Sequence, residues 1–296
     1  MKSLVLVLLV GGVAIAGLAA VSPAQTQETP LAPASDTTEP TTSGRALLPW
    51  TAASRDSGHS VPQADGMELV IVPAGDFLMG SVEGDPDAYD DEKPQHVVYL
   101  DAFWIDRTEV TNAMFERFVE ETGHDAGTWW RDEASGKPDH PVVSVNWFDA
   151  DAYCGWAGRS LPTEAQWEKA ARGTDGRAYP WGDEPPDASR CNFNRNVGDT
   201  TPVGKYSPKG DSPYGAADMA GNVWEWVADW YDEDYYAVSP RDNPQGPSMG
   251  DYRVLRGGSW SDNGFGVSVR AAFRFRNSPV LRYGNFGFRC ARSHSS

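Results

Sequence analysis

The sequence predicts an α+β fold, formed by a single compact domain with little regular secondary structure. The chain of 296 residues contains 12 Trp, 30 Gly and 22 Pro, and its regular periodicity is short wherever it appears. This composition is typical of a loop-rich chain that buried aromatic side chains hold together. Three predicted helices stand among short apolar strands. Each helix is short and has one apolar face, so it needs a larger partner to pack against and is not expected to form a helix bundle. We therefore expect the helices to pack on a larger mixed core.

The N-terminal residues predict export followed by an unstructured linker. Residues 1–24 combine a basic start, an apolar run and small residues suited to cleavage, which is the layout of a secretory signal. The run is also long enough to remain as an uncleaved anchor. Residues 25–65 are rich in Thr, Pro, Ser and Ala and cannot bury enough apolar surface to fold. The folded domain is therefore expected over residues 66–293, in the periplasm or outside the cell.

Apolar runs predict the strands of the domain. Short strands are expected over residues 68–73, 77–80 and 252–255, and a longer strand is expected over residues 96–105. Residues 84–93 form an acidic stretch between them. Because charged side chains seldom enter a core unpaired, we expect this stretch to be solvated surface.

Helix start and stop signals predict three helices. Each begins at a residue whose side chain can cap the first turn, and each ends at a glycine: Thr111 to Gly123, Asn146 to Gly158 and Thr163 to Gly173. In the third helix, Gln166 stands three residues after the N-cap, which predicts a reciprocal capping box.

Charge and cysteine content exclude several classes of function. The formal net charge of −17 would repel nucleic acids and anionic membranes, so neither is an expected partner. The three cysteines are Cys154, Cys191 and Cys290, and no Cys-x-x-Cys pair occurs, so neither a zinc ribbon nor a thioredoxin-type site is predicted. In an exported protein these residues allow at most one intramolecular disulfide and leave one thiol.

The stretch Gly221 to Trp226 places Glu225 between two tryptophans. The indole rings require burial, and a carboxylate buried with them needs a partner. Ca²⁺ is one candidate, since the side chains of Asp218 and Glu225 and the carbonyls of a Gly-rich bend are the oxygen ligands that it accepts. A buried arginine is the other candidate. The residues alone leave both open.

Arginines near the C-terminus alternate with apolar residues. Arg270, Arg274 and Arg289 stand in short extended patterns. Alternation places side chains on a defined face of a strand, where a guanidinium can meet a buried acid. We expect these arginines to maintain the fold rather than to take part in catalysis.

A series of motifs in one order resembles a known family. The motifs are Thr108-Glu109-Val110-Thr111-Asn112, His140-Pro141-Val142, Leu161-Pro162-Thr163-Glu164-Ala165-Gln166-Trp167-Glu168, Pro180-Trp181-Gly182, Thr201-Pro202-Val203-Gly204, Gly221-Asn222-Val223-Trp224-Glu225-Trp226, Arg256-Gly257-Gly258-Ser259-Trp260 and Gly287-Phe288-Arg289-Cys290. Together they resemble the formylglycine-generating enzyme family, also called the sulfatase-modifying factor domain, from Met67 to Arg292. The resemblance implies one compact domain, a variant of the C-type lectin fold.

The resemblance also implies structural calcium. One calcium site of the family falls on the side chains of Asp218 and Glu225 and the carbonyls of Gly221 and Val223. A second falls on the side chain of Asn192 and the carbonyl of Phe193, where a turn-forming role for the asparagine is the alternative. Oxygen-only ligands suit Ca²⁺.

Two further implications concern cysteine. The family pairs the cysteines that correspond to Cys154 and Cys290 in a disulfide, which would leave Cys191 free. Relatives that make formylglycine carry two copper-binding cysteines shortly after Gly-Gly-Ser-Trp or Gly-Gly-Ser-Tyr. Here residues 261–267 contain no cysteine. Cu(I) prefers soft sulfur ligands, so copper is not expected.

These observations predict a calcium-stabilised binding or accessory module, monomeric, with a peptide or small molecule in the lectin-type groove. The groove candidates are Ser259, Trp260, Asp262, Arg270 and Arg274. One alternative is an enzyme of the same family with different oxidative chemistry, as in siderophore maturation, although no two histidines stand at metal-ligand spacing. The other is a formylglycine-generating sulfatase-modifying oxidase.

Overall fold

The computed structural model describes residues 65–262 and 266–294. The predicted signal segment and residues 25–64 of the predicted linker lie outside the described residues. Asp65 is already part of the fold, because its buried carboxylate accepts a hydrogen bond of 2.8 Å from the Tyr153 hydroxyl and pairs with the Arg159 guanidinium. The described domain therefore includes the last residue assigned to the linker.

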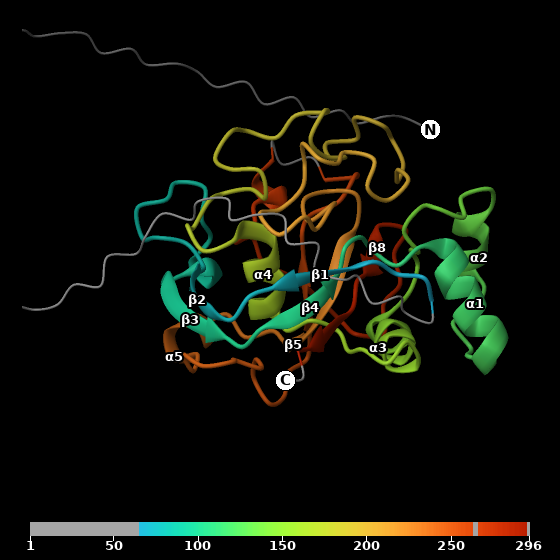
Figure 1. Ribbon diagram of the computed structural model, residues 1–296, viewed down its shortest axis with the longest axis horizontal. Helices are drawn as coiled ribbons and strands as arrows, with labels where there is room; N and C mark the ends of the chain where they lie inside the picture. The colour runs from blue at the N-terminus through green and yellow to red at the C-terminus, as the bar shows by residue number, and fades with distance from the viewer. Residues whose placement is uncertain (1–64, 263–265, 295–296) are drawn as a thin grey trace, which may run out of the picture. The chain divides into compact units, whose positions relative to one another are not determined.

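Nine strands in the described residues form three sheets (Figure 1). They are β1 (Leu69–Val72), β2 (Gly75–Met79), β3 (His96–Leu100), β4 (Phe103–Asp106), β5 (Trp224–Trp230), β6 (Arg253–Arg256), β7 (Phe275–Asn277), β8 (Phe286–Phe288) and β9 (Ala291–Ser293). The sheet orders are β1-β4-β9, β2-β3 and β7-β6-β5-β8. All pairs are antiparallel except β5 with β8.

The described residues also contain five α-helices and two short 3-10 helices. They are α1 (Asn112–Thr122), α2 (Trp129–Ala134), α3 (Trp147–Trp156), α4 (Glu164–Arg172) and α5 (Tyr235–Val238), with η1 (Asp90–Glu92) and η2 (Val267–Val269). The three helices predicted from capping signals are confirmed as α1, α3 and α4. Within the described residues, no helix has the length and apolar character needed to cross a membrane.

One strand prediction was wrong in part, and the strand β5 was not predicted. Residues 96–105 form two strands rather than one, because the chain leaves β3 at Asp101, whose backbone N–H binds the Asn243 side chain, and β4 then enters a different sheet. The residues around Glu225 form the strand β5 (Trp224–Trp230), where no strand was expected from the sequence. Both faces of β5 are covered, so the polar–apolar alternation that marks a half-buried strand is missing.

The faces of the four-stranded sheet separate two apolar clusters. On one face, Trp226 and Phe288 pack with Phe115 of α1 and Tyr153 of α3. The other face contributes Val227 and Val254 to a cluster with Trp167 and other side chains of α4. In Figure 1, α1, α2 and α3 gather at one side of the view, and α4 lies nearer to β2 and β3. Alternation along β5 therefore directs Glu225 toward α4.

The disulfide that the resemblance implied is present. Cys154 of α3 and Cys290, between β8 and β9, are bonded, and their Cα atoms lie 5.6 Å apart. Cys191 is the free cysteine, and burial raises the pKa of its thiol to about 12. A thiol of this kind is inert, because the thiolate is the reactive form.

The capping box of α4 allows a direct test of the helix prediction. Thr163 Oγ1 accepts a hydrogen bond of 3.1 Å from the Gln166 N–H, and Gln166 Oε1 accepts one of 2.9 Å from the Thr163 N–H. We expect Thr163→Ala to lower the free energy of unfolding by about 1 kcal/mol in urea titrations, because the Gln166 N–H in the first turn loses the side-chain oxygen that caps it. Thr163→Ser keeps the oxygen and should cost much less. An equal loss in both variants would contradict the role of the cap.

Candidate functional site

Glu225 is paired with a buried arginine. Both side chains are fully buried, and Arg289 donates 2.7 Å hydrogen bonds to both carboxylate oxygens. Trp167 Nε1 donates a third, 2.8 Å long. The sequence had left arginine pairing and calcium ligation open for Glu225, and the structure shows the arginine.

Two more acids, Glu109 and Asp218, lie near Arg289, and neither forms an ion pair of its own among the described residues. Burial and then the nearby charge of Asp218 raise the pKa of Glu109 well above its usual range, and burial raises the pKa of Asp218 to about 6. Glu109 Oε2 is buried and has no hydrogen-bond partner among the described residues. With Glu225, three buried carboxylates face one guanidinium. The cluster therefore has a deficit of two positive charges when all three acids are ionised.

The predicted calcium ligands lie together but are partly engaged. Asp218 accepts a hydrogen bond from the Gly204 N–H, and both oxygens of Glu225 are bonded to Arg289. Asp218 and Gly221 have φ angles of 56° and 81°, so the chain bends sharply between them. No three His, Cys, Asp or Glu side chains converge at a metal-ligand position within residues 65–262 and 266–294. Calcium at this bend stays a prediction.

The second group of predicted ligands lies beside the first. Asn192 is fully buried, and its backbone carbonyl accepts a 2.8 Å hydrogen bond from the Asn222 N–H. Its Nδ2 donates to the Asp199 carbonyl, while its Oδ1 has no partner in the described part of the chain. Phe193 packs at the edge of a small apolar cluster around Cys191. Asn192 Oδ1 and Glu109 Oε2 are therefore buried oxygens without a partner in the described residues, whereas both oxygens of Glu225 are already bonded to Arg289.

The groove candidates Arg270 and Arg274 lie in buried ion pairs. Arg270 pairs with Glu92 at 2.6 Å, and Arg274 pairs with Glu164 at 2.8 Å. Glu92 belongs to the acidic stretch expected to be solvated, and that expectation was wrong for this residue, because its buried carboxylate meets a guanidinium. Arg256, the first residue of the Arg-Gly-Gly-Ser-Trp motif, forms ion pairs with both Glu164 and Glu168. These arginines maintain the fold.

Asp229 lies near this network and provides a test by pH. Burial is the main cause that raises the pKa of Asp229 to about 7, and the negative charge of Glu164 is the second. Asp229 Oδ2 accepts a hydrogen bond from the Glu164 N–H. Because the folded-state pKa is above the unfolded value, ionising Asp229 costs stability as pH rises from about 4 to about 7.

We expect Asp229→Asn to gain stability relative to the natural chain over that pH range, by about 2–4 kcal/mol. The asparagine still offers an oxygen to the Glu164 N–H. Urea titrations of both proteins at pH 4, 6 and 8 measure the difference, and a difference that does not change with pH would contradict the raised pKa.

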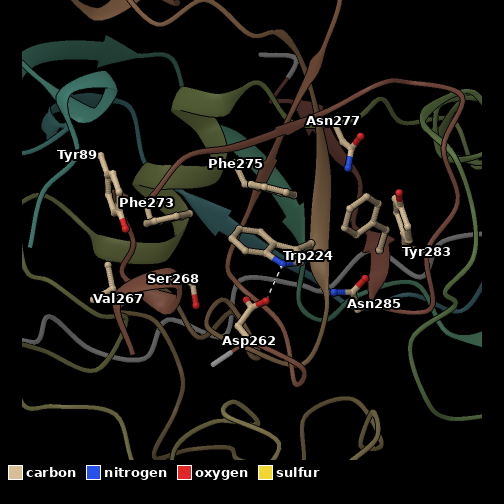
Figure 2. Close-up of a pocket in the computed structure, with 11 residues that line it drawn as sticks. Tyr89, Trp224, Asp262, Val267, Ser268, Phe273, Phe275, Asn277, Tyr283 and Asn285 are labelled. Carbon is tan, nitrogen blue, oxygen red and sulfur yellow. Dashed lines mark hydrogen bonds between the residues drawn. The ribbon is translucent and has the colours of Figure 1, made fainter. Parts of the chain in front are cut away.

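A cavity of about 510 Å³ opens beside β5 (Figure 2). Aromatic rings form most of its wall, and its lining residues are Tyr89, Trp224, Asp262, Val267, Ser268, Phe273, Phe275, Asn277, Tyr283, Asn285 and Phe286. They come from β5, β7, β8 and η2, from the loops beside these elements and, for Tyr89, from the position directly before η1. We call this cavity the aromatic pocket.

Asp262 is the predicted groove residue that lines the aromatic pocket. Its Oδ1 accepts a hydrogen bond of 3.3 Å from Trp224 Nε1, drawn as a dashed line in Figure 2, and its Oδ2 accepts one of 2.8 Å from the Ser259 N–H. Burial raises the pKa of this carboxyl group. Ser259 is buried behind it and accepts a hydrogen bond from Asn285. Trp260 is not among the lining residues.

The aromatic lining was missed, although a signal for part of it was present. Phe273 and Phe275 alternate with Arg274, so the same pattern that directs the arginine to Glu164 directs the two rings to the opposite side. Tyr89 carried no comparable signal, because it lies in the acidic stretch and meets Phe273 only in the fold, with ring centroids 5.4 Å apart.

The fold and the motifs define a sulfatase-modifying factor domain. Residues 55–294 match the Sulfatase-modifying factor enzyme 1-like domain, and the chain belongs to this family. It is 39% identical to the formylglycine-generating enzyme of Streptomyces coelicolor over 300 aligned positions, which cover 82% of this chain and 95% of that enzyme.

Two other relatives show the range of the family. The chain is 36% identical to hercynine oxygenase of Mycolicibacterium smegmatis, and the match covers 75% of this chain but 60% of that protein. The structure of PvdO from Pseudomonas aeruginosa is similar with a TM-score of 0.66 at 27% identity, and the similarity covers 78% of this chain and 95% of PvdO. Family membership is therefore compatible with more than one function.

Proposed function

We propose that this protein is an exported, calcium-stabilised binding or accessory module that holds a peptide or a small molecule in the aromatic pocket. The observation that carries the proposal is the pocket itself. It has an apolar wall with a few convergent polar groups, which is the usual make-up of a ligand site. Fold membership supports the location of a site but does not assign its chemistry.

The thiols of this chain do not support the two-cysteine oxidation of its formylglycine-generating relatives. Asp262 and Val267 line the aromatic pocket within the segment that lacks cysteine. A carboxylate is a hard oxygen donor, whereas Cu(I) prefers sulfur. Cys154 and Cys290 are joined to each other, and Cys191 is buried.

A binding assay combined with a turnover assay tests this proposal. The purified chain is titrated with a random peptide library and a small-molecule library, and it is incubated separately with a Cys-x-Pro-x-Arg peptide under oxygen with copper. We expect saturable binding without any mass change in the peptide. Conversion of its cysteine to formylglycine, detected by mass spectrometry, would overturn the proposal in favour of the oxidase.

Calcium is the metal that the proposal includes. Asp218 and the carbonyls of Gly221 and Val223 would hold it, with Glu109 Oε2 as a further buried oxygen, and the positive charge would offset the excess of carboxylates around Arg289. We expect elemental analysis of the pure protein to find calcium, and EDTA to lower the midpoint of thermal unfolding, because a ligand of the native state stabilises it. Asp218→Asn should lose most of the EDTA effect. A midpoint that EDTA leaves unchanged would contradict the calcium proposal.

The second candidate is an enzyme of the family with other oxidative chemistry. The similarity to hercynine oxygenase, whose name describes an oxygenase, supports this candidate. The lack of cysteine in residues 261–267 is what favours it over formylglycine generation. Two observations together would support this candidate against a module that only binds. The purified protein would contain stoichiometric iron or copper, and it would consume oxygen when a ligand found in the binding screen is added. Export is tested separately by N-terminal sequencing of the mature chain after cell fractionation.

A further inference from the structure

Six aromatic rings follow one another along the wall of the aromatic pocket. Successive centroids are 4.9–6.3 Å apart in the order Tyr89, Phe273, Trp224, Phe275, Phe286 and Tyr283. Figure 2 shows the Trp224 indole at the centre, with Tyr89 and Phe273 on one side and Tyr283 on the other. The faces of such rings carry partial negative charge. The wall is therefore suited to apolar groups and to cations, and less suited to anions.

Asp262 supplies the only formal charge among the described residues that line the pocket. The other polar lining side chains, Ser268, Asn277 and Asn285, are neutral. Asp262 accepts hydrogen bonds from Trp224, from the Ser259 backbone and from the side chains of Ser259 and Ser268, all of them neutral donors. No guanidinium, ammonium or imidazole pairs with it in the described part of the chain. By contrast, Glu92 and Glu225 each have an arginine partner. A half-buried carboxylate without a counter-charge leaves a place for a cation.

We propose that the aromatic pocket binds an organic cation, either the basic side chain of a peptide or a free alkylammonium, with its charge against Asp262 and its carbon atoms against the rings. This inference rests on the proposed binding function. Ring faces attract such cations, and the attraction grows where the pocket excludes water. The pocket volume of about 510 Å³ accommodates a small ligand or a side chain with its neighbours. The net charge of −17 also favours the approach of cations.

Matched probes that differ only in charge test the inference. Acetylated tripeptides containing lysine or arginine are compared with the same peptides containing norleucine or citrulline, and choline is compared with 3,3-dimethylbutan-1-ol. Isothermal titration calorimetry at neutral pH gives each dissociation constant. We expect the cationic member of at least one pair to bind about tenfold more tightly than its neutral partner. The pair with the larger ratio identifies the source as a peptide side chain or a free ammonium.

The variant Asp262→Asn removes the charge and keeps the shape of the side chain. Asp251→Asn makes the same charge change at an exposed position outside the pocket and serves as the control. We expect the ratio of cationic to neutral binding to fall close to one in Asp262→Asn and to stay unchanged in Asp251→Asn. Circular dichroism verifies the fold. If Asp262→Asn does not fold, Phe273→Leu keeps the carboxylate and removes one ring, and it should lower the ratio about threefold.

The outcomes separate this inference from the binding function on which it rests. Equal binding of cationic and neutral probes, or an undiminished preference in folded Asp262→Asn, would overturn the cation inference and leave the binding module standing. Selection of neutral or acidic ligands from the libraries would do the same. If no probe and no library member binds, both proposals fail.

Discussion

Arg289→Ala is expected to lower the free energy of unfolding by about 3–5 kcal/mol, because it leaves buried carboxylates without their counter-charge. Arg289 is fully buried, donates to both oxygens of Glu225, and also donates to the carbonyls of Asp106, Arg107 and Ala217. The alanine variant loses these five hydrogen bonds and keeps the negative charge of Glu225. Urea titration monitored by tryptophan fluorescence measures the effect.

A surface ion pair provides the matched control for this prediction. Arg241 pairs with Asp76 at 2.7 Å, but both side chains are about half exposed, at 55% and 51%. Arg241→Ala should therefore change stability by less than about 1 kcal/mol. The double variant Glu225→Gln with Arg289→Met should recover part of the loss, because the uncompensated charge is removed. A loss below about 1 kcal/mol in Arg289→Ala would show that the pair does not hold the core.

Removal of the Cys154–Cys290 disulfide is the second large effect that we expect. The bridge spans 136 residues and joins α3 to the C-terminal strands. In the chain-entropy treatment, closure of a loop of this length contributes about 4–5 kcal/mol, because it restricts the unfolded chain. The double variant Cys154→Ala with Cys290→Ala should lose about that amount in urea titration. The bond also lies inside the larger apolar cluster, so two small cavities add to the cost.

Two comparisons isolate the contribution of the crosslink. Cys191→Ala removes a buried thiol without removing a bond, so its loss estimates the cost of a cavity alone. The natural chain measured with and without a reductant gives the effect of the bond with all side chains retained. If the reduced natural chain is as stable as the oxidised one, the bridge contributes nothing to stability, and the expectation fails.

Local sequence signals were enough to locate α1, α3 and α4, whereas the short helices α2 and α5 were not predicted. Thr111, Asn146 and Thr163 begin α1, α3 and α4, because a cap acts on N–H groups only two or three residues away. The motifs identified the family and, through it, the disulfide. Strand β5 escaped notice because a strand covered on both faces has no alternation to detect.

The partners of the buried charges depended on the tertiary structure. The sequence established that Glu225 needs a partner, but Arg289 stands 64 positions away, and nothing near Glu225 favours it over a metal ion. Likewise, the aromatic pocket unites Tyr89 with rings from β5, β7 and β8 that lie far along the chain. Capping and periodicity act within a few residues, whereas charge pairing and pocket formation depend on which distant segments the fold brings into contact.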